Sequence, residues 1–199
     1  DNYSKSLKYL NESTKIKSNL FKHPNVEEKN NVLLYSYFCC GFYPLNNVKL
    51  LLIDIIIGHE AYSFLRTKKQ LGYYVNASIN SYQEQYYLFI EVQSTKEIKE
   101  VKKCMDKFVD IFKKLFKKKV NNEVEFKNMK DKIKLLLEKK KNNTSELYSK
   151  YLYEILIKRY FFSKNEIMIE QLNKINQNDL CNFLDNILDK KNQEVIIVK

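Results

Sequence analysis

Apolar positions along the chain follow two periods, which predict a mixture of strands and helices. Residues 31–41 are rich in Val, Leu, Tyr, Phe and Cys, which is typical of a strand buried on both faces. Apolar and polar residues alternate over 71–79, which predicts a strand with one dry face, and 86–93 fits its hairpin partner. Residues 195–198 predict a closing strand.

Other apolar residues recur at intervals of three and four, as helices require. Residues 48–65 are too long an apolar run for one strand and predict a buried helix, bent near Gly58, after a turn at Pro44. The clearest amphipathic helix has Ile98, Val101, Met105, Phe108, Phe112 and Leu115 on one side and lysines on the other. Further helices are predicted over 122–140, 144–160, 164–172 and 177–189.

Two of these helix starts have the spacing of a capping box. The pairs are Asn143 with Glu146 and Ser163 with Glu166. In such a box the first side chain accepts a hydrogen bond from the backbone N–H three residues later. Both pairs are therefore expected to cap their helices.

The order strand, helix, strand, strand, helices, strand predicts an α+β domain. We expect helices packed on one face of a mostly antiparallel sheet, over residues 31–199. Residues 1–30 are polar and weakly patterned, which predicts a linker or an extended lead-in.

The chain has 199 residues and a formal net charge of +11. A charge of this size raises the question of nucleic acid or an acidic membrane. The lysines are spread along the predicted helices, however, which favours solvated faces and makes nucleic acid an unexpected partner. The alternative is a standalone basic module that binds nucleic acid or acidic proteins, with Lys113, Lys114 and Lys117 to Lys119 as its patch.

The four cysteines, Cys39, Cys40, Cys104 and Cys181, have no zinc-ribbon or redox spacing. They favour buried, reduced thiols in an intracellular protein. The cytoplasm is the expected compartment, with an organelle as the alternative. The most apolar run, residues 50–57, is far too short to span a bilayer, so no membrane partner is expected.

Hydrolysis by a zinc peptidase needs three protein ligands, an open metal position and a general base. The chain has two histidines, His23 and His59. His59 and Glu60 could form half of a His-Glu-x-x-His helix, but Ser63 occupies the second histidine position. His59 is therefore expected to be a helix-surface or core residue, and no complete active site is predicted in this chain.

The most informative stretch is residues 65–75, where a strongly apolar helix meets a strand. Gly72, one of three glycines in the chain, lies at the join. Arg66 and Tyr73 flank it, and both can donate hydrogen bonds to peptide carbonyl oxygens. Leu65, Gln70 and Leu71 are the supporting residues of this candidate recognition site.

Each of the two site residues also has a structural interpretation. Arg66 could form an ion pair that caps the end of its helix. Tyr73 could be a core residue, because the strand pattern places it on the apolar face with Val75 and Ala77.

The string Arg-Thr-Lys-x-Gln-Leu-Gly-Tyr-x-Val at positions 66–75 resembles the corresponding segment in the C-terminal half of insulinase-type metallopeptidases, the family of insulin-degrading enzyme and pitrilysin. The resemblance extends over about residues 31–188 and implies an insulinase-type metallopeptidase domain, one of four in such enzymes. Lys69 and Tyr74 depart from the better-known members, which bears on side-chain preference rather than chemistry.

This resemblance implies a non-catalytic role for the chain. Zinc would be the cofactor of the full-length enzyme, bound by another domain, with none in this chain. The partners would be a peptide substrate and the N-terminal catalytic half, which together with the C-terminal half encloses the substrate in a chamber. Arg66 and Tyr73 would reach across to hold the substrate backbone near the zinc.

Overall fold

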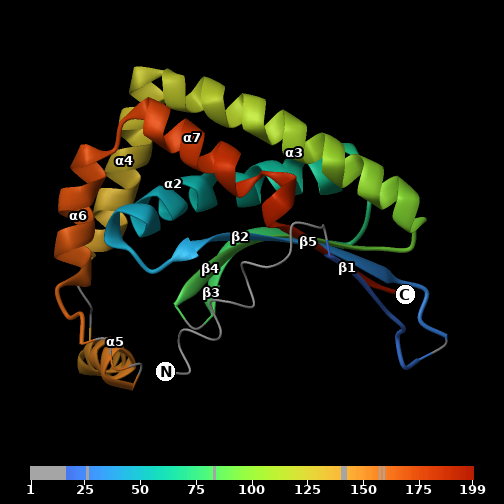
Figure 1. Cartoon of the computed structure of the whole chain (residues 1–199), viewed down its shortest axis with the longest axis horizontal. Coiled ribbons are helices and arrows are strands. Elements are labelled where there is room, and N and C mark those ends of the chain that lie inside the picture. The colour runs from blue at the N-terminus through green and yellow to red at the C-terminus, as the bar shows by residue number, and fades with distance from the viewer. Residues whose placement is uncertain (1–16, 26, 83, 140–142, 157, 159) are drawn as a thin grey trace.

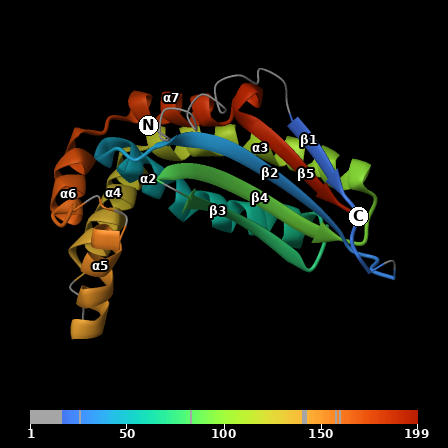
Figure 2. The ribbon, with the colours of Figure 1, turned by 60° about the horizontal axis from the view of Figure 1, so that its bottom comes forward.

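The structure, a computed structural model, describes residues 17–25, 27–82, 84–139, 143–156, 158 and 160–199. Within these residues, five strands form one sheet in the order β1–β5–β2–β4–β3 (Figures 1 and 2). The strands are β1 (Lys17–Phe21), β2 (Asn31–Gly41), β3 (Tyr74–Tyr82), β4 (Gln85–Ser94) and β5 (Gln193–Val198).

The centre of the sheet is antiparallel, with β2 paired to both β4 and β5, and β3 paired to β4. Tyr35 lies opposite Ile90 and Tyr37 opposite Leu88, and all four side chains are buried. Alternate residues of a strand face the same side, so these positions mark the covered face of the sheet. The predicted class, α+β with a mostly antiparallel sheet, is confirmed.

Strand β1 was not predicted as part of the domain. It pairs in parallel with β5, so that Lys17 lies opposite Glu194 and Phe21 opposite Val198. Part of the predicted linker or extended lead-in thus forms an edge strand, while residues 1–16 of that prediction lie outside the described residues. The pairing joins residues from opposite ends of the sequence, and local pattern carries no information about such a contact.

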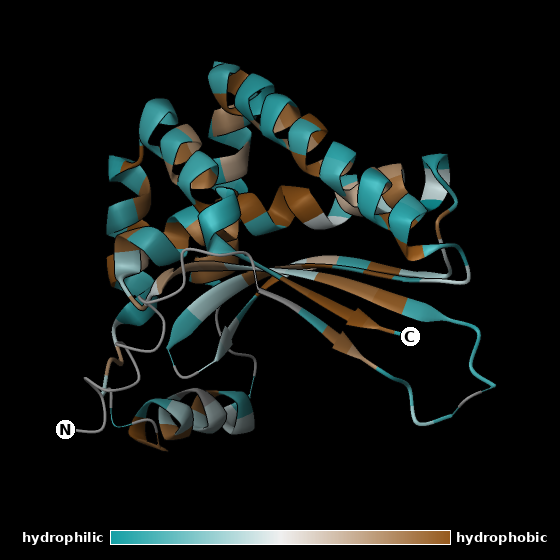
Figure 3. Ribbon diagram, turned by 45° about the vertical axis from the view of Figure 1, so that its right-hand side comes forward, coloured by the Kyte–Doolittle hydropathy of each residue, from teal (hydrophilic) through white to brown (hydrophobic). Residues whose placement is uncertain are grey.

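Helices cover one face of the sheet, as expected, and turn their apolar sides towards it (Figure 3). The covering helices are α2 (Pro44–Ala61), α3 (Ile98–Asn121), α4 (Glu123–Glu138), α6 (Lys164–Lys174) and α7 (Gln177–Ile187), with short helical segments η1 (Tyr62–Lys68) and η2 (Lys190–Asn192). Helix α5 (Thr144–Leu156) lies apart from this layer (Figure 3). In α3 the predicted apolar side is buried at Val101, Met105, Phe108 and Phe112. Helices α5 and α6 lie at the end of the sheet where β3 ends, away from η1 (Figure 1).

Three local predictions about helix boundaries differ from the structure. Helix α2 begins at Pro44, where a turn was expected, because proline is well suited to the first helical turn. The α-helix continues through Gly58, where a bend was expected, and its hydrogen-bonding pattern changes at Tyr62, where η1 begins. The Asn143 side chain accepts from Glu146 N–H at 2.8 Å, whereas Ser163 makes no side-chain cap.

All four cysteines are free thiols, and three of them are half-buried while Cys181 is buried. Burial raises the pKa of the Cys39 thiol to about 12 and that of the Cys40 thiol to about 11. These two cysteines are therefore protonated at neutral pH. In the described parts of the chain, no helix has the length and apolar content needed to cross a bilayer.

Candidate functional site

Helix α2 continues directly into the π-helical segment η1, which carries Arg66. The backbone hydrogen bonds at its end span more residues than those of an α-helix. Lys69 N–H donates to Phe64 O at 3.0 Å, and Leu71 N–H donates to Leu65 O at 3.1 Å. π-Helical turns are rare and frequently occur at functional sites. The sequence predicted a helix here but not this form of it.

The chain then turns sharply and enters β3. Gln70 has a φ of 48°, in the left-handed region, and this residue reverses the direction of the backbone. Leu65 and Leu71, on either side of the turn, are both buried in the core. These three supporting residues therefore fix the two ends of the corner and leave its outer surface to other side chains.

Gly72 packs directly against the last residues of β4. A Cβ atom added at Gly72 would lie 1.8 Å from the carbonyl oxygen of Gln93, a distance that no side chain can occupy. Next to this contact, the buried Ser94 hydroxyl donates to the carbonyl oxygen of Leu71 and accepts from Lys96 N–H at 3.0 Å. Glycine is therefore required for the close approach, and Ser94 ties the corner to β4.

Sequence reasoning did not identify Ser94 as part of the site. Serine has no distinctive period or spacing, and its contact with Leu71 joins residues 23 positions apart. The only sequence signal for this contact was Gly72 itself, which marks a close approach without naming its partner.

Replacing Ser94 with alanine is expected to destabilise the chain by about 1–3 kcal/mol, because the Leu71 carbonyl and the Lys96 N–H would lose their buried partner. Chemical denaturation of the 199-residue chain measures this cost. Ser81→Ala, at an exposed serine of β3, is the matched control. Equal midpoints for the two variants would contradict the proposed tie.

Tyr73 lies outside β3, which begins at Tyr74, and its side chain is 88% exposed. The interpretation of Tyr73 as a core residue is therefore wrong. The strand alternation extrapolated back from Val75 fails because the chain has not yet joined the sheet at Tyr73. Its ring is free to contact a ligand.

Arg66 lies beside Tyr73 on the outer surface of the corner. Its guanidinium carbon is 5.2 Å from the Tyr73 ring centroid and 4.9 Å from that of Tyr62, and its Nη1 donates to the Tyr62 hydroxyl. No carboxylate among the described residues pairs with Arg66, so the predicted helix-capping ion pair is not what holds it. The structure thus brings the two predicted site residues together and adds Tyr62.

The surface around this corner is positively charged. Lys68 and Lys69 follow Arg66 and Thr67 in the sequence, and both lysines are exposed. With three cations in four positions, the corner favours ligands that present oxygen atoms, such as peptide carbonyl or carboxylate groups.

Helix α2 partly closes the free edge of β3 beyond the corner. The Asp54 carboxylate accepts a hydrogen bond from Ile79 N–H at 2.8 Å, and a Cβ on Gly58 would lie 3.1 Å from the Ala77 carbonyl oxygen. Burial raises the pKa of Asp54, while the bond from Ile79 lowers it. Because edge donors and acceptors are what an added strand would use, these contacts prevent a peptide from pairing with the middle of β3.

A zinc ion does not fit the histidines of this chain. The His59 side chain is exposed and lies 3.8 Å from Glu60, while Ser63 supplies no ligand in place of a second histidine. Across the described ranges, no three His, Cys, Asp or Glu side chains come together as a metal site. The described residues therefore provide no ligand set for a catalytic zinc ion.

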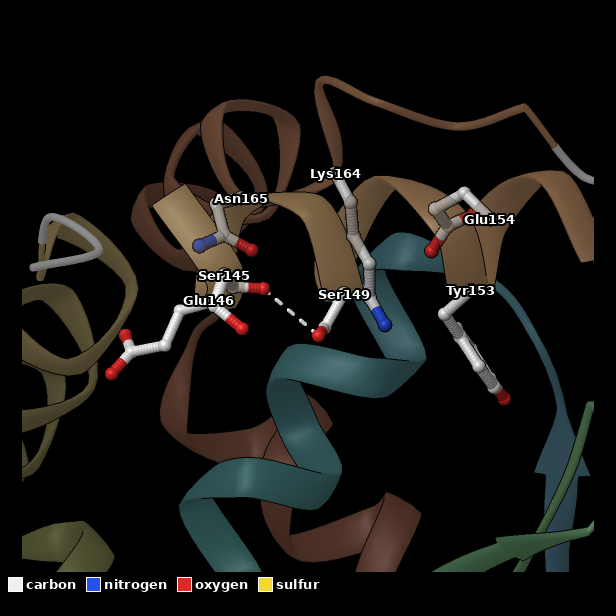
Figure 4. A pocket seen from close by; sticks show the side chains of 7 residues that line it. All are labelled: Ser145, Glu146, Ser149, Tyr153, Glu154, Lys164 and Asn165. Carbon is white, nitrogen blue, oxygen red and sulfur yellow. Dashed lines mark hydrogen bonds between the residues drawn. The ribbon is translucent and has the colours of Figure 1, made fainter. Parts of the chain in front are cut away.

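A cavity of about 540 Å³ lies between α5 and α6 and is lined by polar side chains (Figure 4). The Ser149 hydroxyl in this cavity donates to the Ser145 carbonyl oxygen at 2.9 Å. Glu146, Glu154 and Lys164 also line the cavity and are residue types that can act as bases, but the hydroxyl of Ser149 donates its hydrogen bond to a backbone carbonyl. The corner remains the candidate site, because it brings the two predicted site residues together.

The same fold occurs in solved peptidase structures. Pitrilysin matches with a TM-score of 0.76 at 17% identity, over 94% of this chain and 20% of pitrilysin. The inactive domain of a peptidase M16 from Pseudomonas fluorescens matches with a TM-score of 0.63 at 14% identity, over 92% of this chain and 43% of that one. The fold is that of insulinase-type (M16) peptidase domains.

Sequence comparisons agree with the fold. Residues 51–152, which include η1 and the corner, match the family model described as PQQ synthase PqqF-like, C-terminal lobe domain 4. The chain is also 23% identical to the insulin-degrading enzyme of Drosophila melanogaster over 177 residues, which is 89% of this chain and 18% of the fly protein. The chain belongs to this PqqF-like C-terminal lobe family, and its fold is that of a C-terminal domain of the insulinase type.

Proposed function

We propose that this domain holds peptide substrates for a zinc metalloendopeptidase whose zinc is bound by the N-terminal catalytic half. The chain spans 18% of the fly insulin-degrading enzyme and 20% of pitrilysin, so the proposed enzyme is much larger than this chain. In this proposal, the two halves enclose the peptide in a chamber, and the corner at Arg66 and Tyr73 faces the bound peptide.

The observation that carries the proposal is a pair of donors at a rigid corner, one exposed (Tyr73) and one half-buried (Arg66). Arg66 and Tyr73 lie side by side on the surface, while the backbone beneath them is fixed by Gly72 and by the buried Ser94. Donors held in place next to a scissile carbonyl orient it and stabilise the negative charge that develops on its oxygen. Because the donors do not have to reorganise, this arrangement is more effective than two flexible side chains.

The closure of β3 supports side-chain contacts as the main means of holding the peptide. Hydrogen bonds from an added strand would need the outward backbone groups of Ala77 and Ile79, which α2 already covers. The start of β3, next to Tyr73, lies outside this covered stretch. A peptide that reaches the corner is therefore held by Arg66 and Tyr73 more than by extended strand pairing.

The alternative of a basic module is weakened by the contacts of its proposed patch. Lys113 donates to a backbone carbonyl at 3.2 Å, Lys117 pairs with Asp185 at 2.6 Å, and Lys119 lies within 4 Å of carboxylates on α2 and α4. Lysines that are already paired within the chain contribute less to nucleic-acid binding. That binding gains free energy by counterion release only where a lysine is available to neutralise a backbone phosphate. No specific observation favours this function.

Purified alone, the 199-residue chain is expected to contain no stoichiometric zinc and to leave peptides uncut, because its histidines do not form a ligand set. Metal analysis and a fluorogenic peptide assay with and without a chelator check both expectations. Chelator-sensitive cleavage by a zinc-loaded chain would overturn the assignment of zinc to another domain.

A further inference from the structure

The guanidinium of Arg66 lies close to two tyrosine rings, at 4.9 Å from the Tyr62 centroid and 5.2 Å from the Tyr73 centroid. Both distances are within the range of a cation–π contact, about 6 Å. Tyr62 also accepts a hydrogen bond from Nη1 of Arg66. Tyr62 therefore holds Arg66 by two interactions, a cation–π contact and a hydrogen bond, whereas Tyr73 makes the cation–π contact.

We infer that Tyr62 is a positioning residue, which fixes the Arg66 guanidinium in the orientation that binds substrate. This inference rests on the proposed function of Arg66 and adds a residue that acts through it. Tyr62 need not touch the peptide itself.

The placement of Tyr62 on the helix explains how it can do this. It is the first residue of η1 and lies four positions before Arg66, so the two side chains emerge on the same face. Tyr73 is 88% exposed and comes from the far side of the corner, so its ring alone leaves the long arginine side chain with much rotational freedom. The bond to Tyr62 removes that freedom.

The contact also determines what the guanidinium can offer to a ligand. A guanidinium has five N–H donors in a planar fork, and one of them is used by the Tyr62 hydroxyl. The other donors lie in the same plane and can bind one carbonyl oxygen or the two oxygens of a carboxylate. Without Tyr62, Arg66 would keep these donors, but they would no longer be held in one orientation.

Tyr62 contributes little to the core, which makes its role testable. Its side chain is 46% exposed, whereas the preceding Ala61, at the end of α2, and Leu65 of η1 are fully buried. Replacing the ring should therefore change function more than folding. Tyr62→Phe keeps the ring and removes only the hydrogen bond, and Tyr62→Leu removes both interactions.

The experiment compares these variants in the complete enzyme that contains this chain, using a fluorogenic peptide, with and without Arg66→Ala. We expect kcat/KM to fall about tenfold for Tyr62→Leu and less for Tyr62→Phe, given the usual strengths of cation–π contacts and charged hydrogen bonds. In the Arg66→Ala background, Tyr62→Leu should have no further effect, because the group it positions is gone. Tyr82→Leu, at a 70% exposed tyrosine on the far end of β3, is the control and should leave kcat/KM unchanged.

The outcomes separate the inference from the proposal beneath it. Should Arg66→Ala reduce kcat/KM while Tyr62→Leu does not, or should Tyr62→Leu reduce it equally in both backgrounds, the positioning role is wrong and the role of Arg66 stands. Should Arg66→Ala have no effect, both fail. Thermal unfolding of each variant shows whether it is folded, and a loss of activity in a folded Tyr62→Phe variant supports the role even where Tyr62→Leu unfolds.

Discussion

Gly72→Ala is expected to destabilise the domain by about 3 kcal/mol or more, at the upper end of the range for overpacking. A Cβ at this position would lie 1.8 Å from the Gln93 carbonyl oxygen, whereas real Cβ contacts are at least 3.0 Å, so the corner and the end of β4 must separate by about 1.2 Å. The obstacle is backbone on both sides and cannot move aside as a flexible side chain could. For a domain of this size, such a loss lowers the thermal midpoint by roughly 6–12 °C.

Gly41→Ala provides the matched control for this experiment. Gly41 ends β2, and a Cβ added there meets no atom within 4 Å. Differential scanning calorimetry of the two variants in the 199-residue chain separates a general effect of replacing glycine from the contact at Gly72. Similar midpoints for both variants would show that the corner does not pack as described.

The second large effect is expected from Tyr73→Phe in the complete enzyme. The substitution keeps the ring over Arg66 and removes only the hydroxyl, and Tyr73 is too exposed to matter for the core. If the hydroxyl donates to the substrate as charge develops, kcat should fall roughly 10²-fold, the scale for losing one such donor. Arg66→Ala should lower kcat/KM by a similar factor for the same reason.

Zinc content and folding should be unchanged in both variants, since neither residue is a metal ligand and neither is buried. Tyr82→Phe, which removes a hydroxyl from another exposed tyrosine, is the control for nonspecific effects. Steady-state kinetics with a fluorogenic peptide, together with metal analysis, would decide the matter. Wild-type kinetics for Tyr73→Phe would remove Tyr73 from the site.

Periodic features of the fold could be predicted because burial imposes them locally. Strand β2 and helix α3 were placed correctly at their starts, since each buries a regular set of side chains, such as Tyr35 or Phe108. The parallel pairing of β1 with β5 could not be predicted, because it depends on a partner nearly the whole chain away. The spacing of apolar residues predicts a helix or strand, but not which element it packs or pairs with.

At the candidate site, the residue types were predictable and the geometry was not. The sequence identified the site candidates by residue type: Gly72, Arg66 and Tyr73. The alternation of apolar and polar residues, however, also allowed Tyr73 to be a core residue. Alternation holds only within a strand, and the left-handed turn at Gln70 delays entry into β3 until Tyr74. The π-helical turn and the contacts of Ser94 and Tyr62 arise from tertiary packing, for which the sequence has no period.

The most direct test of the substrate-holding role is a structure of the complete enzyme with an uncleaved peptide bound, obtained with a catalytically inactive variant of the N-terminal half. We predict that the Arg66 guanidinium and the Tyr73 hydroxyl lie about 2.7–3.2 Å from oxygen atoms of the peptide, the range of ordinary hydrogen bonds. A peptide bound elsewhere in the enzyme, with neither group within hydrogen-bonding range, would contradict the account.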